Sequence, residues 1–215
     1  MHKMKYLLCA LSLGSTLMVS GCAPMLIGGA AITTAAVVTD RRSTGSIVSD
    51  EVLEKRVLFN IVEAVGKDNI HVTATSFEGK ILLSGEVLTQ AQKQKAQEVA
   101  LRSLDVKSVV NELAVMELSS VSTRLADSLL ANKVRATLIG SQETSLNQVK
   151  VVVDRKIVYL MGIVTREEAQ KVLNKVAQVT DVQQVVNCFT IATQEEINLR
   201  MPDMKSSNPN LNSES

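Results

Sequence analysis

Residues 105–111 read Asp-Val-Lys-Ser-Val-Val-Asn, and residues 181–187 read Asp-Val-Gln-Gln-Val-Val-Asn. The two stretches share their first two and their last three residues at a spacing of 76. A short run of valines between polar residues is typical of a β-strand. Because two copies occur at one fixed spacing, the stretch indicates a duplicated structural unit.

The duplication extends toward the N-terminus at a spacing of 77. In each copy three apolar residues recur every four positions, a period that places them on one face of a helix. A glycine that ends an apolar strand pattern also matches between the copies. The matching residues are Leu53, Val57, Ile61 and Gly85 in the first copy and Leu130, Val134, Leu138 and Gly162 in the second.

Each copy predicts the order helix, strand, strand, helix, strand. The first copy predicts these at 50–65, 70–76, 80–87, 90–103 and 107–116, with Asp50 as helix N-cap and a turn at Glu78-Gly79. The second predicts them at 124–139, 148–154, 156–163, 166–178 and 182–192. The fold class is therefore α+β, with two tandem modules, each a three-stranded sheet with two helices on one face and the other face open. Gly85 and Gly162 are expected to allow a close backbone approach or a positive φ.

The N-terminus predicts an exported lipoprotein. Basic residues precede an apolar run at 6–19, which is too short for a membrane-spanning helix and typical of a signal peptide. The run ends in Val19-Ser20-Gly21-Cys22, which resembles a lipobox, so Cys22 is the predicted lipidation site. Ala23 follows Cys22, in place of the Asp that resembles an inner-membrane retention signal. We therefore expect a lipid-anchored protein in the outer membrane that faces the periplasm.

The chain is predicted to divide into a signal peptide (1–21), a lipidated N-terminus with linker (22–46), two modules (47–117 and 122–193) and a polar tail (194–215). The apolar segment 23–38 is too short to span a bilayer, and two interpretations stay open, an interfacial anchor or a flexible linker. In the tail, residues 195–201 add one helical turn, and disorder is predicted beyond it.

Composition argues against several classes of function. The chain has 23 basic and 22 acidic residues and 2% aromatic residues, and loss of residues 1–21 with Lys3 and Lys5 leaves 21 against 22. Such a chain lacks the basic field and the aromatic platforms of a nucleic-acid binder. His71 and Cys188 lie in different repeats, and no metal-spaced cluster or phosphate loop occurs. We predict no catalytic residue, no metal and no cofactor, and not an enzyme; Cys188 is expected to be a half-buried structural residue.

The ordered set of elements, with a strand ending in glycine and the Asp-Val-x-x-Val-Val-Asn stretch, resembles the BON domain (bacterial OsmY and nodulation domain). Two such domains behind a lipobox resemble the dual-BON-domain outer-membrane lipoproteins. The resemblance covers the chain up to about residue 193. It implies a non-enzymatic protein that supports outer-membrane integrity and binds anionic phospholipid through the first helix of the second domain.

The predicted first helix of the second module carries an apolar strip on the flank turned away from the sheet. The 3.6-residue period gathers Leu125, Leu129, Ala136 and Ile139 there, and Lys133 and Arg135 border it on either side. An apolar strip edged by cations is suited to an anionic bilayer. From the residues alone, packing against the other module is an equally open interpretation, and the resemblance favours the membrane. Leu129 stands where a member of the family carries a Trp.

The predicted partners are therefore anionic phospholipids. The alternative is an adaptor that docks an outer-membrane assembly protein through its sheet or helix faces.

Overall fold

The computed structural model describes residues 44–140 and 148–200. The predicted signal peptide, Cys22 and the segment 23–38 lie outside the described residues. Both repeats belong to one compact unit, assigned to residues 38–215. Among the described helices, none is both long enough and apolar enough to cross a membrane.

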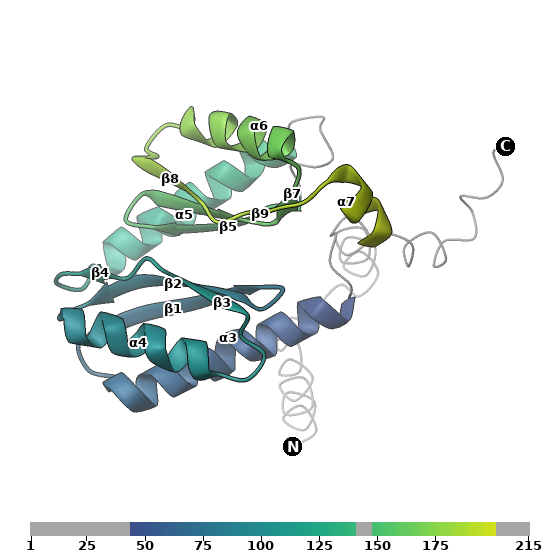
Figure 1. Cartoon of the computed structure of the whole chain (residues 1–215). Helices are drawn as coiled ribbons and strands as arrows, with labels where there is room; N and C mark the ends of the chain where they lie inside the picture. Colours follow the sequence, from purple (N-terminus) through teal and green to yellow (C-terminus); the bar gives the residue numbers. More distant parts are fainter. Residues whose placement is uncertain (1–43, 141–147, 201–215) are drawn as a thin grey trace, which may run out of the picture. The chain divides into compact units, whose positions relative to one another are not determined.

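The first module is an antiparallel hairpin extended by a parallel strand. β1 pairs with β2 in antiparallel register, and β3 and β4 pair with β2 in parallel register. Helices α3 and α4 lie side by side on one face of this sheet (Figure 1). The elements are α3 (Thr44–Val65), β1 (Ile70–Phe77), β2 (Lys80–Val87), α4 (Gln90–Arg102), β3 (Ser108–Asn111) and β4 (Ala114–Val115).

The second module repeats this topology. β5 pairs with β6 in antiparallel register, β8 joins β6 in parallel register, and β9 joins β7 in the same way. The elements are α5 (Val121–Ile139), β5 (Lys150–Asp154), β6 (Ile157–Met161), β7 (Ile163–Val164), α6 (Arg166–Ala177), β8 (Gln184–Asn187) and β9 (Thr190–Ile191). The predicted fold of two tandem α-β-β-α-β modules is confirmed.

The last predicted strand of each module is interrupted. The side-chain oxygen of Asn111 accepts a hydrogen bond from the backbone N–H of Leu113 at 3.3 Å, and Asn187 does the same for Phe189 at 3.0 Å. An asparagine that bonds the backbone two residues ahead favours a turn over a continuing strand. The repeated asparagine therefore marks the point where 107–116 and 182–192 each divide into two short strands.

Asp50 does not have the predicted role. α3 begins at Thr44, so the prediction of Asp50 as its N-cap is wrong. The Asp50 carboxylate is buried, and it accepts hydrogen bonds from Glu78 N and Gly79 N in the turn between β1 and β2, at 2.8 and 3.1 Å. Asp127 on α5 accepts equivalent bonds from Arg155 N and Lys156 N at 2.8 and 2.9 Å. In both modules the first helix thus fixes the hairpin turn.

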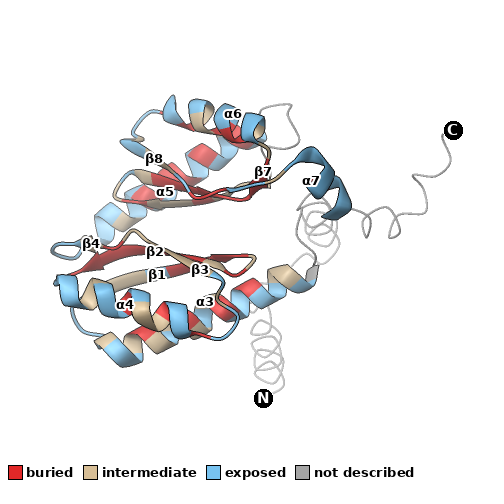
Figure 2. Ribbon diagram, in the orientation of Figure 1, coloured by how far each residue is buried: buried red, intermediate tan, exposed pale blue. Residues whose placement is uncertain are grey.

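Each module has its own apolar core between helices and sheet. Leu53, Val57 and Ile61 are buried in the first, and Leu130, Val134 and Leu138 in the second, as the sequence period predicts. Figure 2 shows the buried residues of the helices as stripes that face their own sheet. The helix phase of both repeats is therefore confirmed.

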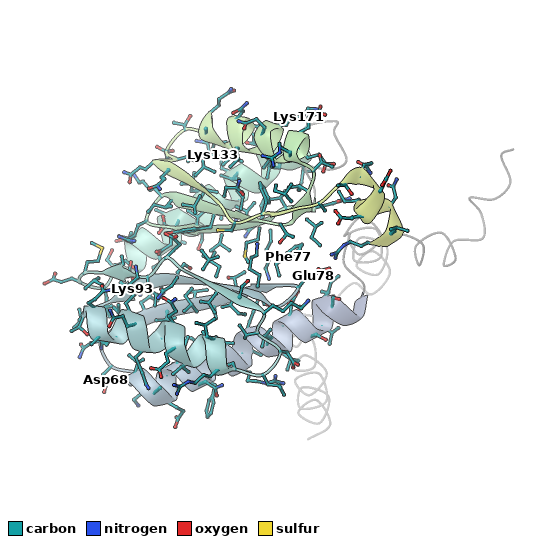
Figure 3. All side chains as sticks on the ribbon, viewed as in Figure 1. Asp68, Phe77, Glu78, Lys93, Lys133 and Lys171 are labelled. Carbon is teal, nitrogen blue, oxygen red and sulfur yellow. The ribbon has the colours of Figure 1, made fainter. Side chains whose placement is uncertain are left out.

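The second face of each sheet is covered, and the prediction of an open face is wrong. A third apolar core joins residues of both sheets: Phe77 and Leu82 from the first module, and Tyr159, Met161, Ile163 and Cys188 from the second. Phe77, at the end of β1, is labelled in Figure 3. Lys80 Nζ donates across the contact to the carbonyls of Cys188 and Phe189 at 3.3 and 3.2 Å. The two sheets therefore pack through the faces that the helices leave free.

The helical turn predicted at 195–201, at the start of the polar tail, is confirmed. α7 (Gln194–Arg200) places Ile197, which is fully buried, in the third core. The Arg200 guanidinium pairs with the Glu78 carboxylate of the first module at 2.8 Å. Residues 201–215 lie outside the described part of the chain.

Gly85 is a position that requires glycine. Its φ is +113°, and a Cβ there would lie 1.9 Å from the backbone oxygen of His71 on β1. Gly162 has no positive φ, and a Cβ there would lie 3.3 Å from the Gln148 oxygen. The predicted close approach therefore holds at both glycines, and the positive φ at Gly85 alone.

We expect Val134→Asp to unfold the second module, because it places an unpaired carboxylate where α5 meets the sheet. A loss of about 4 kcal/mol or more in the free energy of unfolding is expected for such a change. Val57→Asp, the matched change at the same spacing, should unfold the first module. Circular dichroism melting of both variants measures the effect, and wild-type melting curves for both would contradict the core assignment.

Candidate functional site

The predicted strip on α5 is exposed along the whole helix. The exposed fractions of Leu125, Leu129 and Ile139 are 61%, 63% and 65%. Ala136 is exposed between them, and Val121 extends the same face toward the start of the helix. Three large apolar side chains in one row on a solvent-facing helix are unusual for a protein surface. Among the described residues, packing against the first module does not account for them.

The two cations that border the strip are each held by the second module. Lys133, labelled in Figure 3, donates to the Thr180 carbonyl at 3.1 Å and pairs with Asp181 at 3.4 Å. Arg135 donates to the Val151 carbonyl at 2.8 Å, so its guanidinium bonds to the edge strand β5. The cations therefore flank the strip in fixed positions, and Asp181 offsets part of the charge of Lys133.

The first module carries a related strip at the same repeat positions. Val48, Val52 and Phe59 on α3 stand 77 residues before Leu125, Leu129 and Ala136, and all three are more than half exposed. Arg56, the match of Lys133, pairs with Asp105 at 3.1 Å and donates to the Leu104 carbonyl at 3.2 Å.

The aspartate of the repeated sequence stretch has the same conformation in both copies. Asp105 and Asp181 have φ values of 71° and 78°, a left-handed conformation in which Asp is among the better tolerated side chains. Each of these aspartates pairs with the cation beside an apolar strip. The stretch that reveals the duplication therefore also fixes the border of each strip.

A second polar group lies between the modules. His71 Nδ1 lies 2.9 Å from Glu86 Oε2, and Arg155 Nε lies 3.5 Å from both Glu86 Oε1 and Asp154 Oδ2. Gly85 N donates to Asp154 Oδ2 at 3.1 Å, which links the first sheet to the second. Glu86 is fully buried. One donor atom from each of His71, Glu86 and Asp154 lies within 4.8 Å of the others, a donor set that could hold a metal ion.

Burial changes the acid–base properties of this contact. It raises the pKa of Asp154, and the negative charge of Glu86 raises it further while Arg155 lowers it. Burial also raises the pKa of the Cys188 thiol to about 11. Cys188 is therefore an uncharged thiol at neutral pH, and it is fully buried in the sheet contact rather than half-buried.

The sequence does not predict this polar group, because Glu86 and Asp154 are distant from His71 along the chain and lie beside it only in space. The repeat spacing contains the signal, because the matches of Glu86 and Asp154 are Ile163 and Phe77, two residues of the apolar sheet contact. A charged residue in one copy at an apolar position of the other marks a site where the modules differ.

Comparison with known proteins agrees with the repeat. The family model of the BON domain matches residues 49–117 and again 126–193. The chain is 32% identical to the outer membrane lipoprotein DolP of Haemophilus influenzae, over 84% of this chain and 93% of that protein. It is 28% identical to a 21 kDa hemolysin of Actinobacillus pleuropneumoniae, over 68% of this chain and 76% of that protein.

Among solved structures, the C-terminal domain of CdsD, a structural protein of the type III secretion system of Chlamydia trachomatis, is 14% identical with a TM-score of 0.28. It covers 64% of this chain and 98% of its own, and a score this low carries no argument. The two matched domains and the DolP relative decide the assignment: the chain belongs to the BON domain family, as a DolP-like protein with two BON domains.

Proposed function

We propose that this protein is an outer-membrane lipoprotein, anchored through Cys22, that binds anionic phospholipid with the α5 strip and supports envelope integrity. The outer-membrane lipoprotein DolP is a relative along most of the chain, which supports the location. The proposal assigns no catalytic residue. Its membrane part rests on one observation, the uncovered row of Leu125, Leu129 and Ile139 on α5.

The strip is suited to weak, oriented binding. Complete burial of one Leu or Ile side chain contributes about 1.5–3 kcal/mol, and a cation near an anionic surface about 1 kcal/mol. A helix that enters the bilayer only with one flank gains part of this sum. Because acyl chains on Cys22 would keep the module near the bilayer, even weak binding would be highly populated. The anchor would then supply the affinity and α5 the orientation.

The second candidate is an adaptor that docks an outer-membrane assembly protein. The sheet faces are buried against each other, so the adaptor could use only helix faces. The strip of Val48, Val52 and Phe59 on α3 favours this candidate, because it is exposed and belongs to the other module. Vesicle binding by residues 38–215, the compact unit without Cys22, separates the two, since an adaptor would not float with lipid.

We expect Leu129→Glu in residues 38–215 to abolish flotation with anionic vesicles, because a carboxylate at the acyl boundary is strongly disfavoured. The melting temperature should stay within about 2 °C of wild type, since Leu129 is exposed. Val52→Glu is the matched control in the first module and should leave flotation unchanged. A Leu129→Glu variant that floats like wild type would exclude α5 as the binding site.

Replacement of Leu129 by Trp should tighten vesicle binding, because an indole favours the membrane interface.

Lys133→Gln combined with Arg135→Gln should weaken binding to anionic vesicles, and salt should weaken binding of the wild type, because both reduce a surface charge attraction. Vesicle binding that is unchanged both by the two Gln substitutions and by added salt would show that the apolar strip acts alone.

We expect Cys22→Ala to release the chain from the membrane fraction or to leave it uncleaved, because acyl chains supply most of the affinity. Metabolic labelling with a palmitate analogue measures the modification directly. Cys188→Ala is the control and should keep the label, since the Cys188 thiol is buried. A wild-type chain that takes up no label would overturn the lipobox prediction.

A further inference from the structure

The polar group between the modules brings two carboxylates close to one guanidinium. Glu86 and Asp154 contribute the carboxylates, and among the described residues Arg155 is the arginine that pairs with both of them. Glu86 is fully buried, and its Oε1 atom makes no hydrogen bond with any described atom. Its Oε2 atom lies 2.9 Å from His71 Nδ1 and accepts a hydrogen bond from the Ser119 hydroxyl at 3.2 Å. A buried carboxylate oxygen without a hydrogen bond is costly unless a proton or a cation compensates it.

Comparison of the two repeats shows that these charges are not needed for the packing of the modules. At the matching positions, Phe77 and Ile163 close the same sheet contact with apolar side chains. Replacement of buried ionic groups by apolar ones is often neutral or stabilising. Asp154 accepts one bond from Gly85 N across the contact, but apolar packing at these positions does not require a second carboxylate beside it, and a ligand that binds both would give a reason for the pair.

The donor set points to a divalent cation. We propose that His71, Glu86 and Asp154 form a Zn²⁺-class metal site that links the two modules. Imidazole nitrogen and carboxylate oxygen are both zinc donors, and zinc sites with three protein ligands hold water in the fourth position. Two donors about 2.1 Å from one ion are at most about 4.2 Å apart, so a spread of up to 4.8 Å requires only a small shift of side chains.

An opening leads to two of the three residues. A cavity of about 240 Å³ is lined by His71 and Asp154, with Ser84 and Thr73 beside them, and Glu86 is not part of its lining. Its volume is enough for a hydrated ion to enter. His71 is itself half-buried and reaches this cavity from the edge strand β1. An ion can therefore reach His71 and Asp154 without separation of the modules.

The positive charge of Arg155 would repel a cation bound to the same carboxylates. Its Nε atom is buried without a hydrogen bond, and its Nη1 contacts the Met116 sulfur at 2.8 Å, so the carboxylates do not fix it closely. Its side chain is 24% exposed, which leaves a path for the guanidinium toward solvent. A divalent ion in place of the Arg155 contacts would attract the two carboxylates more strongly than one guanidinium does, because it carries twice the charge.

The test is zinc binding by the full lipid-anchored chain in detergent, after removal of metal with a chelator. Titration calorimetry should give one Zn²⁺ per chain, and saturating Zn²⁺ should raise the melting temperature by about 5 °C. His71→Gln and Glu86→Gln should each weaken binding by at least about 100-fold. His71 is the one histidine after residue 21, so its NMR signals report the site without overlap.

Two controls keep the result specific. Glu98→Gln removes an exposed carboxylate of the first module that pairs with Lys95 and Arg102, and it should bind Zn²⁺ like wild type. Cys188→Ala should also bind normally, which separates the site from the buried thiol. His71 is partly exposed, so His71→Gln should remain folded by circular dichroism even if Glu86→Gln does not. Absence of zinc-dependent heat and melting shift, or wild-type affinity in His71→Gln, would overturn the proposal.

Discussion

The packing of one sheet on the other is the interaction on which the other surfaces depend. Each module has a mixed sheet, four-stranded in the first and divided into a three-stranded and a two-stranded part in the second, and two helices cover only one face of it. The remaining faces are apolar at Phe77, Leu82, Tyr159 and Met161, and an exposed sheet of this kind would invite association with other chains. Contact between the two copies within one chain removes that exposure. It also leaves helix flanks as the principal apolar surface of the described residues.

This constraint explains why the duplicated modules are not interchangeable. The same sheet contact is made by Phe77 and Ile163 in one part and by Glu86 and Asp154, their repeat partners, in another. One part supplies apolar area, while the other supplies two carboxylates that lie beside His71 and Arg155. The duplication thus gives two copies of one fold. At the positions where the sheets face each other, one pair of residues packs and the matching pair is charged.

The sequence predicts those features that depend on local period. The helix phase of Leu53, Val57 and Ile61, the hairpin at Glu78-Gly79 and the strip on α5 all follow from spacing within one element. The contact between the two sheets does not follow from spacing. Alternation along a strand distinguishes its two faces, but it does not show whether solvent or another sheet covers the second face. Asp50 was misassigned for a related reason: its partners are backbone groups of a turn 28 residues away. Glu86 and Asp154 lie 68 positions apart, and only comparison between the repeats would have connected them.

The contact between the modules bears on the proposed role of the α5 strip. If the modules moved freely, a strip of three large apolar residues would bind a bilayer in many orientations and would order only its own helix. Bonds on both sides of the contact oppose that motion. Lys150 pairs with Glu54 at 2.6 Å, Arg200 pairs with Glu78 at 2.8 Å, and Gly85 donates to Asp154 at 3.1 Å. When α5 lies on a surface, the first module then has a defined orientation relative to it, including the exposed row on α3. Under the proposed function, weak binding by α5 would thereby also orient the exposed row on α3.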